Sequence, residues 1–198
     1  MSADAPDPFA SGFPTLDAER VRLRAPREAD VAAFLDVFGD ADALRYWSHG
    51  PLVDEDAARA YIESIHTGLR ERSFFQWAVA DRETDAVVGT VTLTSWDRAN
   101  RRAEIGFILA PSHWGQGFAS EAVRRALRFG FGEMGLHRVE ADVDPENAGS
   151  FALLERIGFV REGHLRQRWF TFGSWKDTIL LGLLASDFET ANAAARTS

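Results

Sequence analysis

The chain has 198 residues, a net charge of −8 and no cysteine. This length suits one domain that buries about 70% of its unfolded surface. The negative charge argues against nucleic-acid binding, which needs a basic face, and either favours cationic substrates such as amines or simply aids solubility. The absence of cysteine excludes disulfides, thiolate nucleophiles and cysteine-based zinc sites.

The first 14 residues are acidic and rich in proline, and they lack the basic and apolar regions of a signal peptide. No apolar run reaches the length that spans a membrane. We therefore expect a cytoplasmic protein without a membrane partner, with a flexible lead-in over residues 1–19, one domain over residues 20–185 and a tail over residues 186–198. The histidines show no metal-ligand spacing, so no metal is expected.

The first half of the chain predicts a strand, two helices and three strands. Apolar residues alternate with arginine over residues 20–25, which is typical of a strand, and Pro26 ends the pattern. Over residues 30–38 and 54–69, apolar residues recur every three or four positions, as they do on one face of a helix. Three more strands are expected at residues 75–80, 86–95 and 103–109, with polar turns at residues 81–85 and 97–102 between them.

The second half predicts a helix, a strand, a second helix and a closing hairpin. The first of these helices carries a stripe of alanine, valine and leucine and stops before Gly135. A strand at residues 138–143 precedes a helix from about 148 to 157, for which Asn147 is the expected N-cap. The hairpin turns at Gly173-Ser174. This order predicts a mixed α/β or α+β domain around one sheet.

A glycine-rich turn joins the strand at residues 103–109 to the next helix. Gly115 and Gly117 let an anion approach unpaired backbone N–H groups, and the helix dipole adds positive potential there. A nucleoside-triphosphate P-loop needs a lysine where Phe118 stands, and a dinucleotide fingerprint needs a glycine where Ser120 stands. The turn therefore predicts a phosphate or pyrophosphate site of a third kind.

Two sequence blocks resemble the GCN5-related N-acetyltransferase (GNAT) superfamily. Residues 114–122 resemble the block that grips the pyrophosphate of acetyl-CoA, and Gly117-Phe118-Ala119 match its last three positions. Trp114 replaces the usual Gln or Arg, as in the branch of RimJ/RimL-like ribosomal-protein N-terminal acetyltransferases. Residues 147–159 resemble the second block, Asn-x-x-Ser-x-x-Leu-x-Glu-x-x-Gly-Phe. The resemblance extends roughly over residues 20–185.

The resemblance implies a single α+β (mixed α/β) domain with flanking helices. Its twisted, mostly antiparallel sheet has about seven strands and a splayed central pair. It implies direct acetyl transfer from acetyl-CoA to a primary amine in a ternary complex, which agrees with the absence of cysteine. The acceptor would be a protein N-terminal α-amine or a small amine, and a homodimer is compatible with such a domain. The alternative is a catalytically silent module that senses acyl-CoA.

The resemblance also assigns residues to the cofactor. Backbone groups of the strand would bind the pantetheine amides, the turn would bind the diphosphate, and an asparagine would reach the pantetheine arm unless it only caps its helix. These expected cofactor-binding residues are Phe107, Ile108, Leu109, Gly115, Gln116, Gly117, Phe118, Ala119, Ser120 and Asn147.

Amines are mostly charged at neutral pH, so the reaction benefits from a base that acts directly or through water. Glu104 is the candidate base because it lies at the start of the strand that leads to the turn; alternatively, it faces solvent and pairs with Arg102 or Arg138. Ser150 is the candidate acid where many relatives have tyrosine; alternatively, it only bonds the backbone near the helix start.

The acceptor pocket is the part that the sequence defines least. Its specificity depends on the loops at residues 45–51, 96–102 and 166–175, which fold-level analogy does not describe. Aromatic side chains in or beside these loops either line the pocket or belong to the core. The candidates are Tyr46, Trp47, Trp96 and Trp175.

Overall fold

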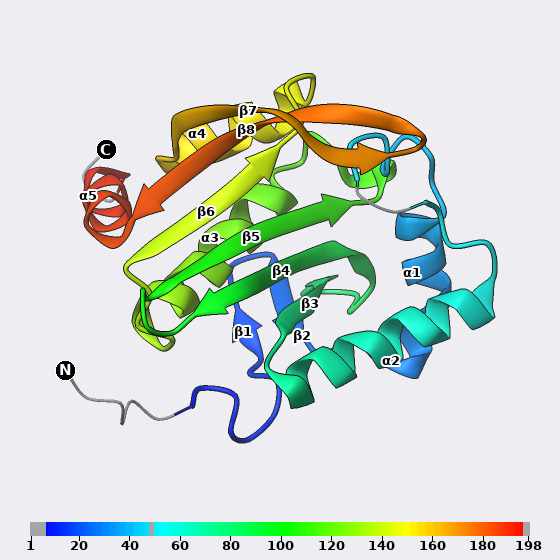
Figure 1. Ribbon diagram of the computed structural model, residues 1–198. Helices are drawn as coiled ribbons and strands as arrows, with labels where there is room; N and C mark the ends of the chain where they lie inside the picture. Colours follow the sequence, from blue (N-terminus) through cyan, green and yellow to red (C-terminus); the bar gives the residue numbers. More distant parts are fainter. Residues whose placement is uncertain (1–6, 48–49, 196–198) are drawn as a thin grey trace.

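An eight-stranded sheet, in the order β1-β2-β3-β4-β5-β6-β8-β7, forms the centre of the protein (Figure 1). The computed structural model describes residues 7–47 and 50–195. All neighbouring strands are antiparallel except the parallel pair β5–β6. The strands are β1 (Leu16–Asp17), β2 (Val21–Arg24), β3 (Phe74–Asp81), β4 (Val87–Asp97), β5 (Arg102–Leu109), β6 (Arg138–Val143), β7 (Val160–Thr171) and β8 (Ser174–Leu184).

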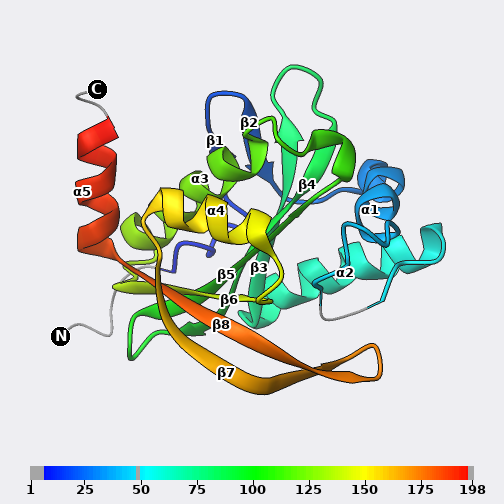
Figure 2. The same ribbon diagram turned by 90° about the horizontal axis from the view of Figure 1, so that it is seen from above.

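Helices cover both faces of this sheet (Figure 2). Helices α1 (Val31–Phe38) and α2 (Glu55–Glu71) pack on one face, and α3 (Phe118–Gly132) and α4 (Ala148–Ile157) pack on the other. Helix α5 (Ala185–Ala195) follows β8, and the short 3-10 helices η1 (Glu28–Asp30) and η2 (Pro111–His113) precede α1 and α3. The predicted α+β architecture is confirmed, with β1 and α5 as additional elements. None of the helices in the described ranges is both long and apolar enough to cross a membrane.

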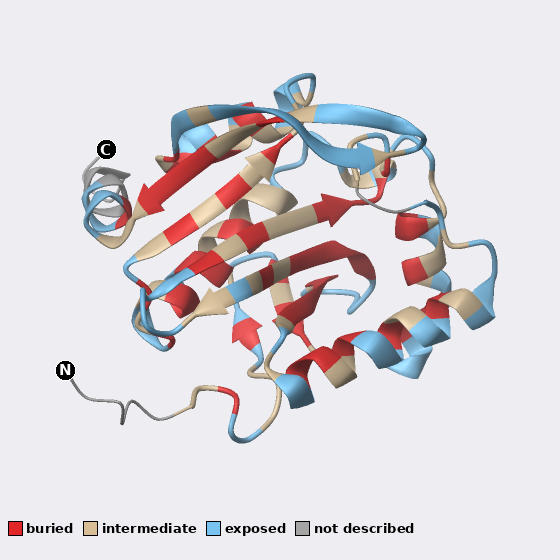
Figure 3. Cartoon of the chain, in the orientation of Figure 1, coloured by how far each residue is buried: buried red, intermediate tan, exposed pale blue. Residues whose placement is uncertain are grey.

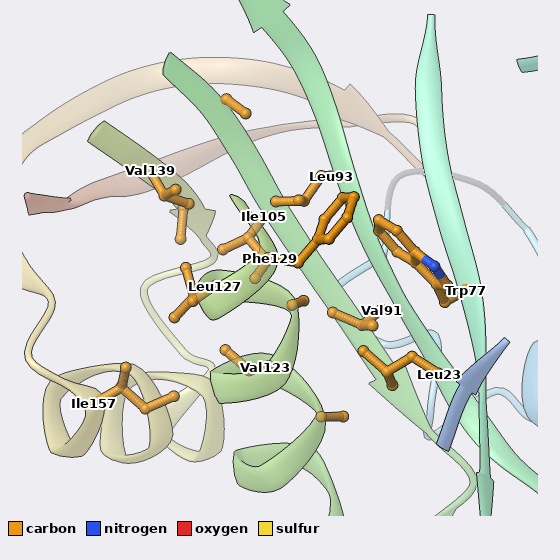
Figure 4. Packing of buried hydrophobic residues seen from close by; sticks show 14 of the residues in the cluster. Leu23, Trp77, Val91, Leu93, Ile105, Val123, Leu127, Phe129, Val139 and Ile157 are labelled. Atoms are coloured by element: carbon orange, nitrogen blue, oxygen red, sulfur yellow. The ribbon is translucent and has the colours of Figure 1, made fainter. Parts of the chain in front are cut away.

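The larger hydrophobic core lies between the sheet and helices α3 and α4. Figure 4 shows Val123, Leu127 and Phe129 of α3 directed at the strands. Alternate residues of β6, such as Val139, are buried against these helices, because successive strand side chains point to opposite faces. The alternate residues of the strands point to the opposite face, on the α1–α2 side. Nearly all of β7 and the first residues of β8 are exposed, whereas the last part of β8 is mostly buried (Figure 3).

The two parallel strands at the centre of the sheet separate soon after they meet. Strands β5 and β6 pair only between residues 102–104 and 138–140. Beyond that point β5 stays paired with β4 as far as Leu109, and β6 stays paired with β8 as far as Val143. The inner edges of both strands are therefore open, which gives the splayed central pair that the resemblance implies.

The described parts of the two segments expected to lie outside the domain contribute aromatic side chains to its core. Residues 1–6 and 196–198 lie outside the described ranges, but Phe9 of the lead-in is only 1% exposed and stacks on Phe75 with ring centroids 3.8 Å apart. In α5, Phe188 is buried and packs against Phe131 at 5.2 Å. Neither residue stands in a run with a clear apolar period, so no pattern predicted its burial.

Replacing Phe9 with alanine is expected to lower the free energy of unfolding by about 3–5 kcal/mol, because the change leaves a cavity beside a stacked ring. Chemical denaturation measures this difference. The control is Phe170→Ala on β7, whose side chain is 61% exposed; there we expect a change within about 0.5 kcal/mol. Equal losses in both variants would mean that the lead-in does not pack as described.

Candidate active site

The turn between β5 and α3 presents backbone amides that have no partner among the described residues. Gly115 and Gly117 adopt φ angles of 72° and 85°, in the left-handed region that favours glycine. The first amide of α3 to find an acceptor is that of Glu121, which donates to the Gly117 carbonyl at 3.1 Å. Within the described ranges, no group accepts a hydrogen bond from the amides of residues 115–120. These donors and the positive end of the helix dipole suit a bound phosphate.

Arg20, just before β2, binds this turn through its guanidinium group. Its Nη1 donates to the carbonyl of Gln116 at 3.0 Å, and its guanidinium lies 5.1 Å from the ring centroid of Phe118. The carboxylate of Glu121 accepts from Arg20 Nε at 3.2 Å and from the backbone amides of Arg20 and Val21. A positive charge is thereby held beside the open amides. The sequence motifs did not predict the pairing of Arg20 with Glu121, because 101 residues separate these two residues.

The opening between β5 and β6 exposes backbone groups of β5. The amide of Ala110 donates to β4 at 3.0 Å. Because successive strand residues direct their backbone groups to opposite sides, those of Ile108 also face β4, whereas those of Phe107 and Leu109 face the opening. The Leu109 carbonyl accepts from Trp114 Nε1 at 2.9 Å. The Leu109 N–H and both backbone groups of Phe107 remain for a ligand, and the unusual tryptophan helps to hold the end of β5.

A cleft with a volume of about 1460 Å³ extends from the turn, through the opening, to the α1–α2 side of the sheet. Most of the predicted site residues line it, but Gln116, Phe118, Trp96 and Trp175 do not. The predicted residues in its lining are Glu104, Phe107, Ile108, Leu109, Gly115, Gly117, Ala119, Ser120, Asn147, Ser150, Tyr46 and Trp47.

Glu104 lines the cleft where β5 and β6 begin to separate, opposite Glu140 in the last paired position. The alternative pairing with arginine is not observed, because Arg102 and Arg138 each donate to Glu140 at 2.9 Å. Burial raises the pKa of the Glu104 carboxyl above its ordinary value, and the negative charges of Asp142 and Glu140 add to the rise. Glu104 is therefore a stronger proton acceptor than an exposed glutamate.

Asp142 on β6 is a cleft residue that the sequence analysis missed. Its carboxylate accepts hydrogen bonds from the hydroxyl of Thr178, from Trp169 Nε1 at 3.1 Å and from Arg168 Nε at 3.4 Å. Its side chain is only 11% exposed. Asp142 thus fixes Trp169 in the wall of the cleft and contributes to the electrostatic environment of Glu104.

Asn147 and Ser150 meet at the start of α4. The Asn147 Oδ1 accepts from the Ser150 amide at 3.0 Å, so the predicted N-cap is confirmed. Both residues also line the cleft. The cap uses only the oxygen of Asn147 and the backbone of Ser150, which leaves the Asn147 amide group and the Ser150 hydroxyl available to a ligand.

Two of the four aromatic candidates lie away from the cleft. Trp96 packs against Phe75 with ring centroids 5.7 Å apart, and Trp175 is 60% exposed and packs against Phe170 at 5.1 Å. In the loop at residues 45–51, Tyr46 and Trp47 do line the cleft, and residues 48–49 lie outside the described ranges. Other side chains complete the α1–α2 end of the lining: Tyr61, Gln76, Thr92, Thr94, Trp169, Phe172 and Thr178.

A row of three threonines on β4, here called the hydroxyl row, could have been predicted from the sequence. Thr90, Thr92 and Thr94 alternate with apolar residues, which places all three hydroxyls on one face of the sheet. Gln76 on β3 joins this row by donating to Thr90 at 3.0 Å and accepting from Tyr61 at 3.1 Å. Strands β3 and β4 therefore supply a polar, uncharged wall, whereas charged residues such as Asp42, Arg45 and Asp142 line other parts of the cleft. In the described part of the chain, no cluster of His, Cys, Asp or Glu is arranged to hold a metal ion.

The fold, the open amides of the turn and the cleft through the sheet together suit a transferase that uses a phosphorylated donor. Comparison with known proteins gives its family. Residues 20–160 match the family model described as an acetyltransferase (GNAT) domain. The chain belongs to this family and is an acetyl-CoA-dependent N-acetyltransferase.

Relatives match nearly the whole chain. An uncharacterized N-acetyltransferase p20 of Bacillus licheniformis is 36% identical over 174 residues, which is 88% of this chain and 98% of the relative. The structure of Mycobacterium smegmatis RimJ in complex with CoA-disulfide has a TM-score of 0.82 at 26% identity, covering 92% of this chain and 94% of that one. Vibrio cholerae spermidine N-acetyltransferase in complex with CoA and spermine has a TM-score of 0.75 at 28% identity, covering 86% and 98%.

Replacing Arg20 with glutamine is expected to weaken CoA binding by about threefold to tenfold, because the half-exposed guanidinium is a charge-assisted donor at the turn. Titration calorimetry with CoA measures the change. Arg22→Gln is the matched control, since Arg22 lies two residues further along the chain, pairs with Asp17 of β1 at 2.7 Å and has no bond to the turn. If both variants bind CoA as the wild type does, Arg20 has no part in the donor site.

Proposed function

We propose that this chain transfers the acetyl group directly to a primary amine in a ternary complex, and that it belongs to the RimJ/RimL-like branch of the family. The observation that carries this proposal is the cleft that runs through the sheet, with Glu104 where the two central strands separate. A donor at the turn and an acceptor on the α1–α2 side would meet there. Direct transfer also fits a chain that has no cysteine to carry the acetyl group.

Each part of the cleft has a proposed task. Acetyl-CoA, when bound, supplies an acetyl group activated as a thioester. The amides of residues 115–120 hold its diphosphate, and the backbone of Phe107 and Leu109 orients its pantetheine arm. Glu104 accepts a proton from the ammonium form of the acceptor, directly or through water, so that the neutral amine can attack. The Ser150 hydroxyl, which lines the cleft, returns a proton to the departing sulfur.

The acceptor is a protein N-terminal α-amine or a small amine. Similarity to RimJ over 92% of the chain favours the first, and similarity to a spermidine acetyltransferase favours the second. The uncharged hydroxyl row on β4 and the aromatic side chains of Tyr46, Trp47 and Trp169 would surround either amine. The relatives named for an activity are acetyltransferases, so the silent sensor has no support among them.

The test is a panel of peptides with free N-termini and of small amines, with the release of free CoA measured for each. Turnover of at least one amine is expected, and the class of that amine separates the two kinds of acceptor. A product analysed by mass spectrometry should carry one acetyl group on nitrogen. Tight CoA binding without turnover of any amine would contradict the proposal and favour a sensor.

A further inference from the structure

Three arginines without a carboxylate partner gather where α3 packs beside α4. Arg124 on α3 donates from Nη2 to the backbone carbonyl of Arg156 on α4 at 3.0 Å, and Arg156 lines the cleft. Arg128 lies one turn further along α3 and acts electrostatically on Arg124. In the described ranges, none of these three guanidiniums forms an ion pair with an aspartate or glutamate, whereas Arg161 nearby pairs with Glu155 at 2.6 Å.

This arrangement is unfavourable for the free protein. Burial lowers the pKa of Arg124, and the positive charges of Arg128 and Arg156 lower it further. The chain carries a net charge of −8, so carboxylates are plentiful elsewhere on it, yet none that the structure describes pairs with this cluster. A bound anion would relieve the mutual repulsion of the three guanidiniums, which makes the cluster a ready anion site.

The cluster is close to the end of the cleft that holds the turn. Ser120 lines the cleft beside the open amides, and Arg124 follows it by one helical turn, a rise of about 6 Å. Side chains of a helix lean toward its N-terminus, so Arg124 leans toward the turn. Asn147 and Arg156 both lie in the cleft lining, so α4 forms a continuous wall from the start of the helix to the arginines.

We propose that Arg124 and Arg156, with Arg128 behind them, bind the ribose 3′-phosphate of coenzyme A. This phosphate is a second anionic group of the same molecule, separated from the diphosphate by one ribose, and guanidinium groups bind phosphate through charge-assisted hydrogen bonds. The proposal rests on CoA lying at the turn. It adds a specificity that the turn alone does not supply, because the enzyme would distinguish CoA from 3′-dephospho-CoA.

The experiment compares the affinities of the full-length protein for CoA and for 3′-dephospho-CoA by titration calorimetry. The wild type is expected to bind CoA more tightly by about tenfold to a hundredfold. Arg156→Gln should remove most of this preference by weakening CoA binding while leaving the affinity for 3′-dephospho-CoA unchanged. Arg124→Gln should do the same, although it also removes the bond to the Arg156 carbonyl. Arg156→Gln leaves that backbone bond in place, so it tests the site without the loss of helix contact.

Arg70→Gln on α2 is the matched control for the loss of one positive charge, since Arg70 pairs with Glu63 away from the cleft. This variant should keep the full preference for CoA. Equal affinities of the wild type for the two ligands, or an equal loss of both in Arg156→Gln, would overturn the proposal while leaving CoA binding at the turn intact. If neither ligand binds the wild type, the placement of CoA at the turn is itself wrong.

Discussion

Replacing Gly117 with tryptophan is expected to weaken CoA binding at least about a hundredfold, because the indole would occupy the space of the diphosphate and displace its charge-assisted hydrogen bonds. A Cβ atom at this position would lie 3.0 Å from Arg20 Nη2. The side chain would therefore also disturb the guanidinium that braces the turn. Calorimetric titration with CoA measures the loss.

Backbone strain needs its own control, since a non-glycine residue at the Gly117 φ of 85° costs roughly 1–2 kcal/mol. Gly135 has a φ of 64° and open space around its Cβ position. Gly135→Trp should therefore carry similar strain and keep its affinity for CoA. Unchanged CoA affinity in a folded Gly117→Trp protein would show that the turn does not hold the diphosphate.

Replacing Glu104 with glutamine is expected to lower kcat by about a hundredfold, the usual range for loss of a general base. The affinity for CoA should stay the same, because Glu104 lies at the point of strand separation and not at the turn. Steady-state rates and a CoA titration separate these two effects. Glu133→Gln, at the exposed end of α3, is the control and should keep the wild-type rate.

The pH dependence gives an independent check. Burial and two neighbouring carboxylates raise the pKa of Glu104 above the ordinary glutamate value of 4.5. As the pH is lowered, the wild-type rate should therefore begin to fall at a higher pH than it would with an ordinary glutamate as the base. The variant should lack this acidic limb. A raised pKa in the folded state also means that the stability contributed by protonated Glu104 is lost as pH rises through that pKa. Glu104→Gln should therefore unfold at a slightly higher temperature than the wild type at neutral pH, but not at acidic pH.

Helices and strands could be predicted from the sequence because apolar residues repeat in them at short, regular intervals. The stripe of α3, the N-cap Asn147 and the glycine turn each depend on residues within one or two helical turns, and the structure has all three. Strand β1 has two residues, which is too short for any period. The burial of Phe9 depends on the distant ring of Phe75, which no local pattern contains.

The acceptor side was harder to predict because it depends on which face each strand residue occupies. Trp175 was expected in the pocket, whereas Trp169 is the tryptophan of the hairpin that lines the cleft. The β7–β8 ladder has a bulge between Leu165 and Trp169, beyond which Trp169 pairs with Lys176 and Phe170 pairs with Trp175. Trp169 and Trp175 therefore point to opposite faces of the hairpin. Gln167 in this bulge has a φ of 52°, and glutamine is not a residue type that predicts a positive φ.

The short β5–β6 pairing, here called the seam, lies between two groups of strands that are also separate in the sequence. Every strand that precedes residue 110 lies on one side of this seam, and every strand that follows lies on the other. The ladder that joins the two groups of strands is short, pairing residues 102–104 of β5 with residues 138–140 of β6. The β7–β8 hairpin can therefore change in length or composition without shifting the pairing among β1 to β5. The part of the cleft wall that this hairpin supplies, with Trp169 and Phe172, can therefore be remodelled while the turn between β5 and α3 stays intact.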